Sequence, residues 1–158
     1  LRPGDSERLM QGHGFDGSPL PDVKATPVMA GASSIYSTTN DILKWLGWHL
    51  DRFSADGAGT RLVDHAAYVF RDALSPTYGL DESGRMDAMS LGWIVMAPEG
   101  DRPLILQKAG GLQGMFVYAA FAPNHGIGVF VAINEFNFGA ATNMAVAVNA
   151  LIADLAPR

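Results

Sequence analysis

One run most constrains what this chain can fold into: residues 107–123, which read QKAGGLQGMFVYAAFAP. Lys108 ends a short apolar run, and two adjacent glycines, Gly110 and Gly111, precede an aromatic and aliphatic segment. This order is typical of a sheet strand beside a cleft, because glycine lets a ligand lie close to the backbone. A backbone N–H at such a position can bind a developing oxyanion. We therefore expect neighbouring strands with one lysine on the cleft side.

Composition indicates a packed globular domain. The chain has 158 residues, of which 48% are hydrophobic and 17% charged, so a single domain with a core is expected and disorder is not. The formal charge of −5 gives no basic surface for nucleic acid, and no nucleic-acid partner is expected. The absence of cysteine excludes disulfides and Cys metal sites. We see no apolar stretch of the ~18 residues that a membrane-spanning helix needs.

The first half predicts a loop-rich segment over residues 1–38 and a helical part over residues 39–90. Thr38, Thr39 or Asn40 can cap a helix, and Asp41 suits the positive end of its dipole. A second helix is predicted over residues 62–74, ended by Ser75-Pro76. The three tryptophans are interpreted as core residues. The expected apolar faces comprise Ile42, Leu43, Leu46, Leu50 and Phe53 in the first helix, and Val63, Ala66, Ala67, Phe70 and Leu74 in the second.

The second half, residues 91–158, predicts antiparallel strands and a closing helix. Strand patterns cover residues 91–97, 104–108, 115–122 and 126–134, and the last two strands are joined by a hairpin at residues 123–126. Residues 139–155 repeat apolar side chains at helical spacing. Helices followed by neighbouring strands and a covering helix predict an α+β fold, an antiparallel sheet with helices packed on it.

The string Lys108-Ala109-Gly110-Gly111 is the main candidate site. Taken alone, such a string is more often a turn or strand end than a site. Its context favours function, because a lysine near a cleft needs a carboxylate, a phenolate or a substrate anion as partner. Lys108 and Gly111 are therefore the candidate catalytic residues, and Ala109, Gly110 and Gln113 the candidate substrate-binding residues.

The remaining polar residues are interpreted as structural. The histidines, at positions 13, 49, 65 and 125, lack metal-ligand spacing, so we read them as surface or packing residues. The carboxylates at positions 81, 82 and 87 lie in a polar loop without an apolar wall, which favours a solvated face. Neither a metal nor an organic cofactor is expected.

The stretch from Leu91-Gly92-Trp93 through the Lys-Ala-Gly-Gly string to the last helix resembles the C-terminal part of class C β-lactamase-like serine hydrolases. Upstream, residues 30–41 (AGASSIYSTTND) resemble the small-residue segment and helix cap of the same family. The resemblance covers about residues 12–156 and is greatest to the branch of periplasmic D-alanyl-D-alanine carboxypeptidases and endopeptidases. It implies a β-lactamase/penicillin-binding (transpeptidase-like) fold, a serine acyl-enzyme and a periplasmic location.

The family's two upstream motifs, Ser-x-x-Lys and Tyr-x-Asn, do not occur in this chain. We therefore expect the chain to be the C-terminal portion of a larger enzyme, an incomplete β-lactamase-like domain that is inactive alone. The resemblance implies that Lys108 holds the active-site tyrosine and assists proton transfer. It implies that the N–H of Gly111 is one oxyanion donor and that its carbonyl accepts from the substrate amide.

The chain departs from the family's Lys-Thr-Gly string at Ala109, and Gly111 stands where a serine is usual. Hydroxyls that could hold a substrate carboxylate are absent, which puts strong β-lactamase activity in doubt and leaves room for cross-linked peptides or esters. Gln113 is the candidate replacement contact. On this reasoning Ala109→Thr in the complete enzyme would favour carboxypeptidase over endopeptidase activity.

Three alternatives stay open beside a peptidoglycan hydrolase: an esterase of the same fold, a non-catalytic penicillin-binding-like module that holds a ligand or partner, and an unrelated α+β domain. The expected ligand is a peptidoglycan peptide or a β-lactam. Because a family-type sheet takes further strands from its N-terminal segment, we expect an open edge here. The chain should then associate with that missing segment or with a second copy of itself.

Overall fold

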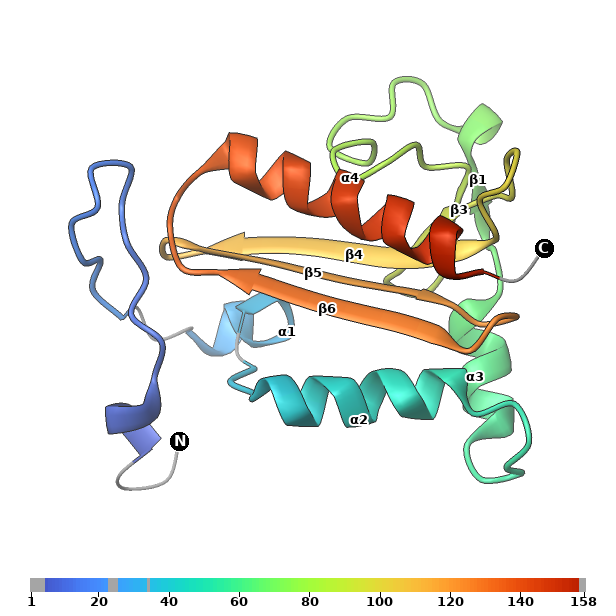
Figure 1. Cartoon of the computed structure of the whole chain (residues 1–158), viewed down its shortest axis with the longest axis horizontal. Helices are drawn as coiled ribbons and strands as arrows, with labels where there is room; N and C mark the ends of the chain where they lie inside the picture. The colour runs from blue at the N-terminus through green and yellow to red at the C-terminus, as the bar shows by residue number, and fades with distance from the viewer. Residues whose placement is uncertain (1–4, 23–25, 34, 157–158) are drawn as a thin grey trace.

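The computed structural model describes residues 5–22, 26–33 and 35–156. Its centre is a six-stranded antiparallel sheet with strand order β1-β2-β3-β4-β5-β6. Helix α4 covers one face of the sheet and helix α2 lies against the other (Figure 1). The predicted α+β class is confirmed.

The strands are β1 Val69–Phe70, β2 Ala88–Met89, β3 Ile94–Met96, β4 Ile105–Leu112, β5 Met115–Ala122 and β6 Ile127–Ile133. The helices are α1 Ala30–Ser33, α2 Thr39–Leu50, α3 Ala58–His65 and α4 Phe138–Leu155, with short 3₁₀ turns η1 Asp5–Arg8, η2 Pro27–Met29 and η3 Arg71–Ala73.

The three long strands form a continuous meander. Strand β5 has the bounds that its apolar pattern predicts, and the turn at residues 123–126 joins it to β6 as expected. Strand β4 is longer than the predicted residues 104–108, because Gly110 pairs with Val117 and Gly111 with Phe116 across the β4–β5 hairpin. The glycine pair therefore lies inside a strand and does not end it.

Two apolar clusters lie on opposite faces of this sheet. Beneath α4, Ile105, Tyr118 and Ile152 are fully buried, together with neighbouring alanines and Val148. Beneath α2, Leu106, Phe121 and Trp93 pack against Leu46. Adjacent residues of β4 alternate between these two clusters, as the period of two along a strand requires. This alternation decides which side chains of the candidate motif can share a face.

Helix α2 begins as the sequence predicts. The Thr38 side chain accepts a hydrogen bond from the Asp41 backbone N–H and closes the first turn. Its apolar face is narrower than predicted, because the helix ends at Leu50 and leaves Phe53 exposed. Trp45 also departs from the prediction of a core residue, since 43% of it remains exposed.

The predicted helix over residues 62–74 is wrong. Helix α3 ends at His65, Ala66 turns to an extended conformation, and strand β1 and turn η3 follow. The helix starts after Gly57, whose φ of 70° is accessible to glycine at little cost. Its buried residue is Arg61, whose guanidinium donates to two backbone carbonyls and stacks over Trp48. The expected apolar face is largely exposed, so the segment at residues 39–90 contributes strands as well as helices.

Helix α4 bears on the expectation that no stretch of this chain is long and apolar enough to span a membrane. With 18 residues and a mean hydropathy of 1.4, it is long and apolar enough to cross a membrane by those two measures alone. Polar residues interrupt it, which is why no uninterrupted apolar run is visible in the sequence. Its buried side chains, Ala145, Val148 and Ile152, pack in the cluster on β4 and β5. The helix therefore acts as the cover of one sheet face in this structure.

The segment before residue 39 includes three short helical turns and a loop fixed to the sheet. The His13 backbone N–H donates to the Asn134 carbonyl, and the His13 carbonyl accepts from the Phe136 N–H. Gly12 lies so close to the β4–β5 turn that a Cβ there would overlap the Gln113 carbonyl. Within the predicted loop-rich segment, residues 1–4, 23–25 and Ser34 lie outside the described residues.

Candidate functional site

Lys108 lies on the α2 side of the sheet and borders a pocket. The pocket has a volume of about 340 Å³ and lies between α2, α3, the connection from β2 to β3, and β4. Its walls include Trp45, Trp48, His49, Asp64, Trp93 and Lys108. Within the described part of the chain, the Lys108 ammonium has no hydrogen-bond or ion-pair partner. Lys108 is exposed at this pocket, so water can solvate its ammonium, and an anionic ligand that enters the pocket can take the place of that water.

The edge of β4 beyond Lys108 is open. Strand β3 pairs only with Ile105, Leu106 and Gln107, whereas β5 pairs with β4 as far as Leu112. Among the described residues, the side of β4 facing away from β5 therefore lacks a strand partner from Lys108 onward. Backbone donors and acceptors on such an edge are available to an extended ligand. Both glycines are exposed along this stretch.

The other predicted site residues do not share one face. Gly110 is on the Lys108 side, since it lies two residues further along the strand. Ala109 packs against the α4-side cluster and pairs with Tyr118, and Gly111 lies opposite Phe116. A side-chain hydroxyl at position 109 would point away from the pocket, which removes the structural basis for the expected effect of Ala109→Thr. Ala109 and Gly111 can reach a ligand only through their backbone groups.

Gln113 occupies the β4–β5 turn in a left-handed conformation with φ of 53°. The turn is held in place by the N-terminal loop, because Gly114 lies against the His13 backbone and Gly12 lies against the Gln113 carbonyl. The structure therefore puts Gln113 at the end of the open edge. Its backbone conformation depends on a contact made by residues about 100 positions earlier.

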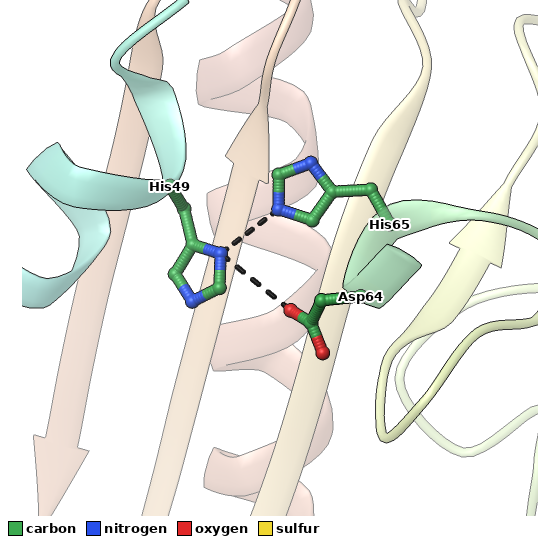
Figure 2. Close-up of side chains that lie close together, drawn as sticks. All are labelled: His49, Asp64 and His65. Atoms are coloured by element: carbon green, nitrogen blue, oxygen red, sulfur yellow. Dashed lines mark hydrogen bonds and ion pairs between the residues drawn. The ribbon is translucent and has the colours of Figure 1, made fainter. Parts of the chain in front are cut away.

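A cluster that spacing did not reveal lies at the inner wall of the pocket. His49 lies in the last turn of α2, and Asp64 and His65 are the last two residues of α3 (Figure 2). His49 Nδ1 is 2.8 Å from His65 Nε2 and 3.7 Å from Asp64 Oδ2. The Trp93 indole N–H donates to the same Asp64 oxygen at 2.9 Å. In the sequence these three residues are isolated polar positions within two predicted helices. Their spacing gave no reason to expect their side chains to meet.

Burial governs the protonation of this cluster. It lowers the pKa of His49 to about 4, helped by the neighbouring His65 and opposed by the Asp64 charge. Burial also lowers the pKa of His65, against the same carboxylate. Both imidazoles are therefore neutral at pH 7.

Comparisons with known proteins identify the class. Residues 2–153 match the beta-lactamase family, and the chain belongs to that family. It is 32% identical over 127 residues to the D-alanyl-D-alanine-carboxypeptidase/endopeptidase AmpH of Escherichia coli K12, covering 79% of this chain and 32% of that relative. The chain thus spans about a third of the length of the curated relative. The resemblance inferred from the sequence, including a match to only part of a longer enzyme, is confirmed.

Solved structures agree. A beta-lactamase/D-alanine carboxypeptidase from Yersinia pestis, complexed with citrate, superposes with a TM-score of 0.78 at 33% identity, covering 99% of this chain and 43% of that one. A class C beta lactamase from Rhodobacter sphaeroides superposes with a TM-score of 0.70 at 15% identity, covering 96% and 48%. The second likeness shows the fold alone. Together they confirm the predicted β-lactamase/transpeptidase-like fold.

Proposed function

We propose that this chain forms the lysine-bearing strand side of the active site of a periplasmic serine acyl-transfer hydrolase. The proposed substrates are D-alanine-containing peptides of peptidoglycan, cleaved by DD-carboxypeptidase and DD-endopeptidase reactions, with β-lactams as acylating ligands. The nucleophilic serine is supplied by residues outside these 158. The names of the AmpH and Yersinia relatives support the substrate class.

The observation that carries the proposal is the combination of two features of the described residues: Lys108 has no ion-pair partner among them, and none of their strands pairs with the edge of β4 that follows Gln107. A substrate peptide lying along β4 would add a strand through main-chain hydrogen bonds. The Gly111 N–H would donate to the oxyanion formed on acylation, and its carbonyl would accept from the substrate amide. Lys108 would stabilise the deprotonated form of the group that activates the serine.

Labelling by fluorescent penicillin tests the proposal. The chain joined to the segment encoded upstream in its reading frame should be acylated covalently, and the 158 residues alone should not. In the joined protein, Lys108→Ala should slow acylation by about 10²-fold or more. Lys44→Ala is the matched control, because Lys44 is an exposed lysine of α2 whose partner is Asp41 on the surface. Equal acylation rates in the two variants would remove Lys108 from the reaction.

The same experiment separates the alternatives. Reversible penicillin binding without acylation in the joined protein would indicate a non-catalytic binding module. Acylation together with hydrolysis of simple esters, but without release of D-alanine from a D-alanyl-D-alanine peptide, would indicate an esterase. Covalent labelling of the 158 residues alone would contradict the proposed division of the site.

The proposed partner is the N-terminal segment of the same enzyme, or a second copy of this chain. Among the described strands β6 pairs only with β5, so its outer edge is available to another strand. Exposed apolar residues on α2, including Leu43 and Trp45, offer further apolar surface to a partner. Light scattering at micromolar concentration should show association of the isolated chain, and a stable monomer would argue against this partner.

A further inference from the structure

The His49, Asp64 and His65 cluster brings together three side chains that bind metals. One ligand atom from each residue lies within 4.8 Å of the other two (Figure 2). Asp64 and His65 come from the end of α3, and His49 reaches them from the end of α2. The sequence predicted no metal ligands among the histidines, because the two helices that meet here are separated along the chain.

The spacing of these atoms suits a small tetrahedral ion. Zinc–ligand bonds of about 2.0–2.1 Å place neighbouring ligand atoms roughly 3.3–3.4 Å apart in a tetrahedron. The observed separations of 2.8 Å between the two imidazole nitrogens and 3.7 Å between His49 Nδ1 and Asp64 Oδ2 lie on either side of that value. The third separation, between His65 and Asp64, is at most 4.8 Å, so side-chain shifts of up to about 1.5 Å would bring the three atoms to tetrahedral spacing.

The facing nitrogens also require a cation or a proton between them. Two neutral imidazoles that present lone pairs to each other repel, so one nitrogen carries a hydrogen in the metal-free form. A bound metal replaces that hydrogen bond with two coordinate bonds. The remaining nitrogen of His49, Nε2, is buried and has no hydrogen-bond partner within the described residues.

The surroundings hold the ligands in position. The His49 ring contacts the rings of Trp45, Trp93 and Phe121 at centroid distances of 4.6, 5.2 and 5.1 Å. The Trp93 N–H orients the Asp64 carboxylate, as outer hydrogen bonds commonly do at metal sites. His49 and Asp64 both line the 340 Å³ pocket, which leaves room for a fourth ligand such as water or an anion.

We propose that His49, Asp64 and His65 form a binding site for a divalent transition-metal ion of the Zn²⁺ type, open to the pocket that Lys108 borders. Two imidazoles and one carboxylate favour Zn²⁺, Co²⁺, Ni²⁺ or Cu²⁺. Mg²⁺ and Ca²⁺ prefer sets of oxygen ligands and do not fit this one. The site needs no residue outside the chain.

Calorimetry on the chelator-treated chain tests the site directly. Zn²⁺ should bind with one ion per chain, and Mg²⁺ should show no saturable binding. Co²⁺ should develop the visible d–d bands of a four-coordinate complex. His65→Gln and Asp64→Asn should each weaken Zn²⁺ binding at least about tenfold. The asparagine keeps an oxygen acceptor for Trp93, which preserves the packing around it.

His125→Gln and His13→Gln are the matched controls, because these histidines lie in the β5–β6 turn and the N-terminal loop. Both should bind Zn²⁺ like the unmodified chain. Circular dichroism without metal checks that each variant is folded. Absence of saturable Zn²⁺ binding at millimolar concentration, or unchanged binding in folded His65→Gln, would overturn the proposal and leave a hydrogen-bonded histidine pair. Loss of binding in a control variant would place the ion elsewhere and overturn it equally.

Discussion

Replacing Gly111 by alanine should destabilise the chain, whereas the same change at Gly110 should not. The two glycines are adjacent in β4 but lie on opposite faces of the sheet. A Cβ at Gly111 would lie 2.6 Å from two ring carbons of Phe116, its cross-strand partner. A Cβ at Gly110 would meet only Val117 Cγ2, at 3.4 Å, which is an ordinary contact.

The magnitude follows from these contacts. Alanine in a strand is favoured over glycine by roughly 0.5–1 kcal/mol of backbone entropy, and Gly110→Ala should gain up to that amount. At Gly111 the Phe116 ring must move, although it packs against Phe136 and Phe138 at centroid distances of 5.3 Å. Overpacking of this kind costs about 1–3 kcal/mol. After the entropy gain is subtracted, Gly111→Ala should lose about 1 kcal/mol, within a range of roughly 0–2.5 kcal/mol.

Urea unfolding followed by tryptophan fluorescence measures both changes. Phe116→Leu completes a double-mutant cycle, since a smaller side chain should accept the new methyl group. A coupling of at least about 0.5 kcal/mol between the substitutions at 111 and 116 is expected. Equal stabilities for Gly110→Ala and Gly111→Ala, or strict additivity in the cycle, would refute the argument that Phe116 requires a glycine opposite it.

Three further predictions concern stability. Tyr118→Phe should cost about 1–3 kcal/mol in urea unfolding, because Asn149 Oδ1 loses a buried donor at 2.7 Å; an unchanged midpoint would contradict this. Thr38→Ala should cost about 0.5–2 kcal/mol through the lost cap of α2, whereas Thr38→Ser should restore most of it. The Arg71 guanidinium lowers the pKa of Asp81, so the pair stabilises the fold fully above the ordinary aspartate pKa of 3.8. This stabilisation is lost progressively as pH falls from 3.8 toward the lowered pKa of the folded chain. The difference in urea midpoint between the unmodified chain and Asp81→Asn should therefore narrow from pH 7 to pH 3, and a constant difference would exclude the charge effect.

Local signals in the sequence were sufficient for much of the fold. The uninterrupted apolar run of β5 and the turn after it predicted both strand and hairpin, since such patterns depend on neighbouring residues alone. The cap at Thr38 predicted the start of α2 for the same reason. The prediction of a helix over residues 62–74 was wrong, because the local sequence pattern there was ambiguous. Helical spacing at residues 62–74 gave no sign that burial of Arg61 and the turn at Ala66 would end α3 early.

The sequence by itself determined the family, the α+β class and the choice of Lys108 as the lysine of the candidate site, because these follow from motifs and from local patterns along the chain. Only the tertiary structure decided that β3 stops opposite Gln107, so that no described strand pairs with the following edge of β4, because strand pairing depends on residues distant in sequence. The tertiary structure also decided that Ala109 lies on the sheet face opposite to Lys108. It likewise decided that His49 lies beside His65. Such contacts arise from the packing of two helices on a sheet, which no spacing within either helix encodes.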